Sequence, residues 1–247
     1  MNPALLLDML LLVVLPYAAV TLFLVGSIIR YRRTPFSVSS YSSQFLESRQ
    51  SFKAVIPFHT GIIVVLVGHL IALLVPRTVL AWNSVPLRLY ILEGASLVCG
   101  LLALVGIVAI MLRRRGVSRV RHVTTRMDVV IYVLLFVQVL AGVYIAVFNG
   151  WGSSWFAVLA APYLTSLAIF QPDVAMLEAA PFMVKLHIVG AFVLLALTPF
   201  SRLMHVLVMP WHYLVRRPQL VRWYGIRRGA PGATGVAAPP AHRSARS

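Results

Sequence analysis

Four histidines lie in two apolar stretches of the chain, two in each stretch. His59 and His69 are ten residues apart in PFHTGIIVVLVGHLIALLVP, and His187 and His205 are eighteen residues apart in KLHIVGAFVLLALTPFSRLMHVLVMP. Each stretch is long enough to cross a bilayer, which takes about 20 residues. Ionisable side chains are scarce at membrane depth and are usually functional there.

The spacing of these histidines selects the chemistry they can perform. Along an ideal helix His59 and His69 are roughly 15 Å apart, and His187 and His205 roughly 27 Å apart on one face. One metal ion cannot gather all four, because ligand bonds are about 2 Å long. One buried histidine alone would be read as neutral and hydrogen-bonded to a neighbouring helix. Four on two helices indicate two sites, each with one imidazole from either helix, as in axial ligation of haem.

Composition restricts the type of haem and the class of protein. The chain is 60% hydrophobic and only 11% charged, and its mean hydropathy is +0.88, which is typical of a polytopic membrane protein. It has one cysteine, Cys99, read as a small buried hydrophobe. A lone cysteine excludes a disulfide framework, a cysteine-ligated iron–sulfur cluster and a CxxCH haem attachment. Any haem is therefore non-covalent and of b type.

Hydropathy predicts an all-α integral membrane bundle of five transmembrane helices, at about 5–29, 55–75, 89–112, 129–148 and 183–209. The net charge of +16 lies mainly in the segments after the first and third spans and in the C-terminal tail. This asymmetry predicts the N-terminus outside and the C-terminus in the cytoplasm, and it makes the charge a topology signal rather than a nucleic-acid site. A sixth span at 151–170 would break that asymmetry, so this segment is expected at the outer surface.

The remaining boundaries follow from local composition. The N-terminal run is expected to be a retained span and not a cleaved signal peptide, because it lacks a basic n-region. Residues 1–225 form the predicted membrane domain, and the Gly-, Ala- and Pro-rich residues 226–247 a disordered basic tail. Asp128, just before the fourth predicted span, is expected to be its N-cap.

Matching depth across this topology pairs the histidines. His59 and His205 form a predicted inner pair near the cytoplasmic face, and His69 and His187 a predicted outer pair. The opposite pairing would put the two ligands of each haem on opposite sides of the membrane. Arg202, three residues before His205, is a candidate contact for an inner-haem propionate, with snorkelling to headgroups as the alternative.

Several motifs also carry a family resemblance, which extends over about residues 1–225. SSQFLESR at 42–49, FHTGIIVVLVGHL at 58–70, RVRHVTTRMDVVI at 119–131 and the stretch 185–222 with TPFSRLMH resemble the gamma subunit, a dihaem cytochrome b, of membrane-bound respiratory nitrate reductase. The resemblance implies a multi-pass protein of the cytoplasmic (inner) membrane with two b haems and the same histidine pairing. It also implies quinol oxidation near the outer haem, with electrons passing to the inner haem, an iron–sulfur beta subunit and a molybdenum alpha subunit.

The chain departs from the family at the quinol site. The family's site is associated with a lysine in the connection before the third helix, whereas residues 76–90 here, PRTVLAWNSVPLRLY, contain none. Arg88 is the nearest cation, so Arg88 and Glu93 are the candidate quinone-pocket residues, Glu93 as a proton acceptor. The cytoplasmic segments 39–53, 113–126 and 210–225 are the predicted docking surface for the partner, with a charge that only sets topology as the alternative, above all for 113–126.

Two alternatives to this function stay open at the level of sequence. The first keeps the haems and makes the chain the equivalent subunit of a nitrite oxidoreductase or of a sulfur-metabolising complex. The second is a transporter in which buried histidines relay protons.

Overall fold

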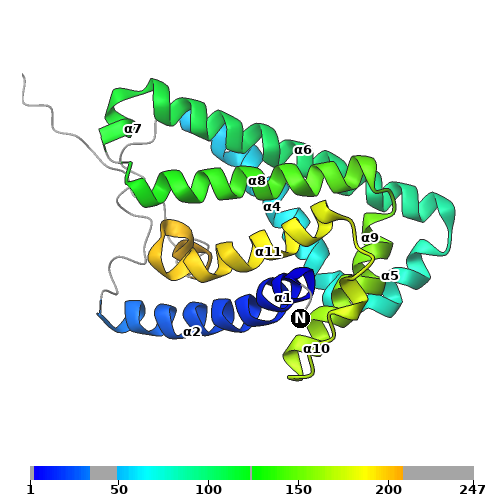
Figure 1. Ribbon diagram of the computed structural model, residues 1–247. Coiled ribbons are helices and arrows are strands. Elements are labelled where there is room, and N and C mark those ends of the chain that lie inside the picture. Colours follow the sequence, from blue (N-terminus) through cyan, green and yellow to red (C-terminus); the bar gives the residue numbers. More distant parts are fainter. Residues whose placement is uncertain (1–2, 34–48, 123, 208–247) are drawn as a thin grey trace, which may run out of the picture. The chain divides into compact units, whose positions relative to one another are not determined.

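The computed structural model describes residues 3–33, 49–122 and 124–207. These residues form helices and no strand, and five helices among them are long and apolar enough to cross a membrane (Figure 1). The predicted all-helical class and the predicted number of spans are therefore confirmed. The predicted tail 226–247, the docking segment 210–225 and most of the docking segment 39–53 lie outside the described residues.

The first three spans and their connections follow one another along the chain. The first span combines α1, the π-helical turn η1 and α2, and the second is α4. The short helix α5 leads into the third span, α6, and α7 follows it. Their bounds are α1 Pro3–Met9, η1 Leu10–Val14, α2 Leu15–Arg33, α4 Arg49–Leu74, α5 Pro76–Asn83, α6 Pro86–Gly116 and α7 Ser118–His122.

Helices α4 and α6 form the most extensive helix pair, and two glycines allow their backbones to approach closely. A Cβ at Gly61 of α4 would collide with backbone atoms of α6, at Cys99 and Ala103. A Cβ at Gly106 of α6 would likewise collide with the backbone of Phe58 in α4. Small residues at helix contacts are the usual means of close packing in membranes, where burial from water does not drive helix association.

Helix α8 (Arg126–Phe148) begins with a reciprocal cap. The Thr125 side chain accepts a hydrogen bond from Asp128 N at 3.1 Å, and the Asp128 carboxylate accepts one from Thr125 N at 3.0 Å. The prediction that Asp128 is the N-cap was therefore wrong: Thr125 is the N-cap and Asp128 is the third helical residue. The pair satisfies two backbone donors that the first helical turn leaves without partners.

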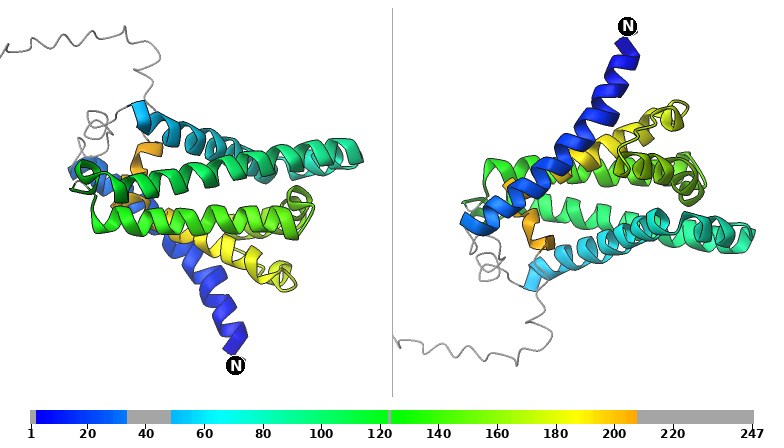
Figure 2. Two further views of the ribbon diagram at one scale, coloured as in Figure 1. Left: turned by 90° about the horizontal axis from the view of Figure 1, so that it is seen from above. Right: turned by 90° about the horizontal axis from the view of Figure 1, so that it is seen from below.

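Helix α8 lies beside α6 in each view of Figures 1 and 2 and also packs against α11 (Phe182–Leu197). Between α8 and α11 the chain forms a helical segment that is not among the membrane spans. It consists of α9 Gly152–Trp155, η3 Phe156–Ala160 and α10 Ala161–Ala168, followed by the 3₁₀ turn η4 Ala175–Leu177.

The segment 152–168 packs on the first span through a buried tyrosine. Tyr163 is fully buried, and its hydroxyl donates to the Leu12 carbonyl in the π-helical turn at 2.6 Å. Burial raises the pKa of Tyr163, so the phenol stays a donor. Tyr17 of α2 donates in return to the Leu167 carbonyl at 3.1 Å. Tyr163, Leu12, Leu167 and Leu177 belong to one buried cluster, which anchors the N-terminal span.

The fifth span does not continue to residue 209 as one helix, contrary to the prediction. Helix α11 ends at Leu197, a 3₁₀ turn η5 covers Thr198–Phe200, and a second 3₁₀ segment η6 covers Arg202–Leu207. Pro199 has no N–H to donate and clashes with the preceding turn, so it ends the α-helix. Ser201 between the two turns is extended, at φ −125° and ψ 178°. The ideal-helix relation between His187 and His205, with both rings on one face, therefore does not hold.

Candidate functional site

The structure brings His59 and His205 together. The two ring centroids are 6.1 Å apart with an interplanar angle of 58°, and the rings come from α4 and η6. His59 Nδ1 donates to the Val55 carbonyl at 2.9 Å, and His205 Nδ1 donates to the Arg202 carbonyl at 2.7 Å. Because a carbonyl can only accept, both rings carry the proton on Nδ1. This leaves Nε2 of each ring as a potential metal ligand.

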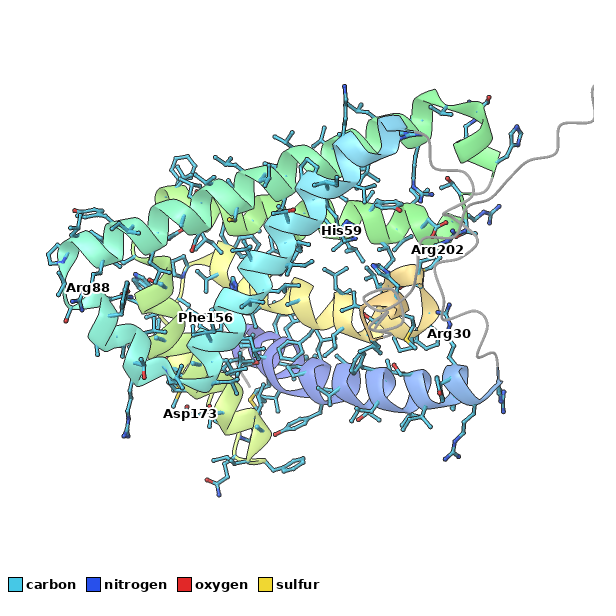
Figure 3. All side chains as sticks on the ribbon, turned by 180° about the vertical axis from the view of Figure 1, so that it is seen from behind. Arg30, His59, Arg88, Phe156, Asp173 and Arg202 are labelled. Carbon is cyan, nitrogen blue, oxygen red and sulfur yellow. The ribbon has the colours of Figure 1, made fainter. Side chains whose placement is uncertain are left out.

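His69 and His187 form a second pair, from the other end of α4 and from α11. Their ring centroids are 6.3 Å apart with an interplanar angle of 38°. His69 Nδ1 donates to the Val65 carbonyl at 2.8 Å, so the His69 Nε2 is again the available nitrogen. The Phe156 ring from η3 packs edge-on against the His69 ring, with the two ring centroids 5.0 Å apart; Phe156 is labelled in Figure 3.

His187 is held by its backbone rather than by its ring. Gln138 of α8 donates to the His187 carbonyl at 2.9 Å. Gly142, one turn further along α8, leaves space for the ring, since a Cβ there would lie 3.1 Å from His187 Cε1. The buried Nδ1 of His187 has no hydrogen-bond partner among the described residues. Buried polar atoms are normally satisfied, and the His187 ring lacks the carbonyl acceptor that orients each of the other three rings through Nδ1.

The spacing within each pair suits one metal ion held between two imidazoles. With each ligating nitrogen about 2 Å from the metal and about 1 Å from its own ring centroid, the centroids would be about 6 Å apart. A direct hydrogen bond between two rings, with its nitrogens about 2.9 Å apart, would place the centroids nearer 5 Å. The observed 6.1 and 6.3 Å match the first arrangement. No set of three or more His, Cys, Asp or Glu residues suited to a metal ion occurs within 3–33, 49–122 and 124–207.

Arg202 forms an ion pair in the structure. Its Nε lies 3.2 Å from Asp128 Oδ1, and Asp128 is buried while Arg202 is exposed. The pair ties η6, which carries His205, to the first turn of α8. A buried carboxylate requires such a partner, because desolvation penalises an unpaired charge. Arg202, the residue predicted to contact a haem propionate, therefore already pairs with the Asp128 carboxylate.

The two quinone-pocket candidates have defined contacts on the side of the second pair. The Arg88 guanidinium lies over the Trp82 ring, 5.2 Å from its centroid, and Figure 3 shows Arg88 apart from Phe156. Glu93 of α6 accepts hydrogen bonds from Ser153 N at 2.8 Å and from Ser153 Oγ at 2.6 Å. Glu93 thus caps the helical segment 152–168 that carries Phe156.

Sequence reasoning did not identify Phe156, Gln138 or Gly142 as part of the second pair's surroundings. Gln138 carried a usable signal, since it is an amide within an otherwise apolar span and polar side chains at that depth usually have a specific partner. Phe156 carried none, because one aromatic residue in an apolar segment is unremarkable until the fold places it on a histidine.

These features define the class of protein: a five-span, all-helical membrane protein with two pairs of histidines. Within each pair the two rings face each other from different helical segments. The sequence pattern of the nitrate reductase gamma subunit family matches residues 8–224. The chain therefore belongs to the nitrate reductase gamma subunit family, and it is a membrane-anchoring subunit of an oxidoreductase.

The sequence similarity to known proteins covers most of the chain. It is 32% identical over 207 residues to the nitrate reductase gamma chain of Bacillus subtilis (strain 168), covering 82% of this chain and 92% of that relative. It is 33% identical over 212 residues to the respiratory nitrate reductase 1 gamma chain of Escherichia coli (strain K12), covering 84% and 93%. The nitrate reductase-like protein NarX of Mycobacterium tuberculosis (strain ATCC 25618 / H37Rv) is 32% identical over 228 residues, which are 87% of this chain and 35% of that relative.

Proposed function

We propose that the chain is a dihaem b-type cytochrome subunit that takes electrons from quinol and delivers them to a partner subunit. His59 and His205 would hold the inner haem, and His69 and His187 the outer haem. Haem iron with two imidazole ligands supplies one-electron transfer. The observation that carries the proposal is the ring separation of 6.1 and 6.3 Å, which suits one iron between each pair.

The protein residues orient these ligands. Val55, Val65 and Arg202 supply carbonyl acceptors that fix three of the four rings through Nδ1. A hydrogen bond from Nδ1 to a carbonyl sets the tautomer of the ring and raises the basicity of the ligating nitrogen. The Gln138 side chain holds the fourth ligand, His187, by donating to the His187 backbone carbonyl.

The outer pair is the proposed quinol site. Gly68, the neighbour of His69 in α4, has open space where a side chain would stand. A flat, apolar headgroup arriving from the lipid could therefore approach this edge of α4. Of the two candidate residues, Glu93 is the better placed for this site. Glu93 contacts the segment whose Phe156 packs on His69, whereas the Arg88 guanidinium stacks on Trp82.

The proposed orientation has the N-terminus outside and the inner pair facing the cytoplasm of a cell membrane. It is supported by the arginines at the ends of α2 and α6, which the positive-inside rule places in the cytoplasm. The proposed partners are an iron–sulfur beta subunit and a molybdenum alpha subunit, in line with relatives named gamma chains of nitrate reductase. Quinol oxidised outside and a partner reduced inside would separate charge against about 2.3 kcal/mol per 100 mV for each electron.

An absorption spectrum of the purified, membrane-extracted protein tests the proposal. We expect reducible b-type bands and two haems per chain. A folded but colourless preparation would refute the redox function and favour a histidine relay in a transporter.

A further inference from the structure

The ligand-bearing end of the fifth span is detached from helix α11. In an uninterrupted α-helix the Leu203 N–H would donate to the Pro199 carbonyl, four residues earlier. In this structure Leu203 N donates instead to Ser201 Oγ at 3.2 Å. The break therefore leaves the Pro199 carbonyl without its helical partner, and it leaves η6, with His205, without the rigidity of a continuous helix.

Arg30, at the end of the first span, donates hydrogen bonds to carbonyls of the broken turn. Its Nη1 donates to the Pro199 carbonyl at 2.7 Å and to the Ser201 carbonyl at 2.6 Å. Hydrogen bonds from an ionised donor are about twice as strong as neutral ones. Figure 3 shows Arg30 and Arg202 at the same end of the helices, with Arg88 at the other.

Two small residues of α2, Gly26 and Ser27, allow this helix to approach the broken turn closely enough for Arg30 to reach its carbonyls. A Cβ at Gly26 would lie 2.8 Å from Pro199 Cβ, so only glycine allows this approach of α2 to the turn. One residue later, Ser27 Oγ donates to the sulfur of buried Met204 at 3.6 Å. Helix α2 thus contacts residues 199–204, which precede His205, through Gly26, Ser27 and Arg30.

We propose that Arg30 is a positioning residue for His205, and hence for the inner haem; this inference rests on the proposed function. The His205 ring is oriented by its bond to the Arg202 carbonyl, and residue 202 directly follows Ser201, which Arg30 holds. A shift of Ser201 therefore moves the ring relative to His59. His187, by contrast, lies within the regular helix α11 and does not depend on this contact.

The alternative role of Arg30 is that of a cytoplasmic charge that only sets topology, and a lysine separates the two roles. Arg30→Lys keeps the charge but replaces the planar guanidinium, whose Nη1 donates to both carbonyls, with an ammonium on a shorter and more flexible side chain. Arg33→Lys, three residues later on the same helix and exposed, is the matched control. Arg30→Gln, which keeps an amide donor without the charge, is the second variant.

The experiment uses the complete complex purified from membranes, with haem content, the low-temperature electron paramagnetic resonance signal and the reduction potential measured for each haem. In Arg30→Lys we expect roughly tenfold weaker retention of the inner haem, the low end for loss of a residue that supports a metal ligand, together with a shifted signal and potential. Arg30→Gln should shift the same signal. The outer haem and both haems of Arg33→Lys should keep their wild-type values.

Three results would overturn the proposal. The first is an inner-haem signal and potential unchanged in Arg30→Lys. The second is an equal disturbance of both haems. The third is that both Arg30 variants fail to accumulate while Arg33→Lys does, which would make Arg30 a general folding residue. A wild-type complex without two haems would instead defeat the proposed function itself, so the two failures are distinguishable.

Discussion

Replacing Gly106 by alanine should separate α4 from α6 at the level of the inner pair. A Cβ at Gly106 would lie 2.6 Å from Phe58 Cα and 2.7 Å from Phe58 Cβ, whereas ordinary contact begins at 3.4 Å. The obstructing atoms include backbone, which cannot rotate away, so we take the upper end of overpacking costs, about 3 kcal/mol. Alanine recovers about 1 kcal/mol through its higher helix propensity. The net loss of stability is then about 2 kcal/mol.

Gly94→Ala, in the same helix, is the matched control because nothing lies within 4 Å of its Cβ position. It should be neutral or up to about 1 kcal/mol more stable, from helix propensity alone. Unfolding of the detergent-solubilised protein by heat and by denaturant measures the difference between the two variants. Haem spectra on the same samples report the local effect: Phe58 directly precedes His59, so the inner haem should be disturbed first and the outer haem spared.

Equal stability of the Gly106→Ala and Gly94→Ala variants would refute this reasoning. So would loss of the outer haem with retention of the inner one, because the displaced contact lies next to His59 and ten residues from His69.

Three further predictions concern the outer half of the protein. Tyr163→Phe should lower the free energy of unfolding by about 1–3 kcal/mol, because the Leu12 carbonyl loses its buried donor; Tyr17→Phe should cost less, and the reverse order in denaturant unfolding would contradict the role of the buried cluster. Gly68→Leu should slow quinol oxidation while both haems stay bound, because the leucine side chain would fill the open space beside His69; unchanged quinol kinetics would place the quinol elsewhere. In vesicles supplied with a quinol donor and nitrate, about two protons should appear outside for each quinol; proton release on the cytoplasmic side would assign oxidation to the wrong end.

The spans and the proximity of the histidines follow from sequence because both depend on simple periodic quantities. Five long apolar runs can be satisfied in a bilayer only as helices, and the depth of each histidine follows from its position in its run. Depth matching selected the same two pairs whose rings the structure places together, His59 with His205 and His69 with His187. Whether each pair holds haem is a prediction that the experiments above address.

The local backbone could not be predicted as well. Pro199 indicated at most a bend in the fifth span, since the choice between a kinked α-helix and two 3₁₀ segments depends on which partners take the released carbonyls. Arg30, the partner found in the structure, belongs to another span and looked like a topology charge. The cap of α8, in contrast, could have been predicted from the sequence. Thr125 and Asp128 have the spacing of a capping box, in which Thr125 and not Asp128 is the N-cap.

That two histidine pairs hold two haems is tested most directly by the haem content of single histidine variants in the purified complex. His59→Ala and His205→Ala should each remove one and the same haem, identified by its signal and potential, and His69→Ala and His187→Ala should each remove the other. If the two members of a pair remove different haems, or if any of the four variants keeps both haems with wild-type signals, the assignment of the two sites is wrong.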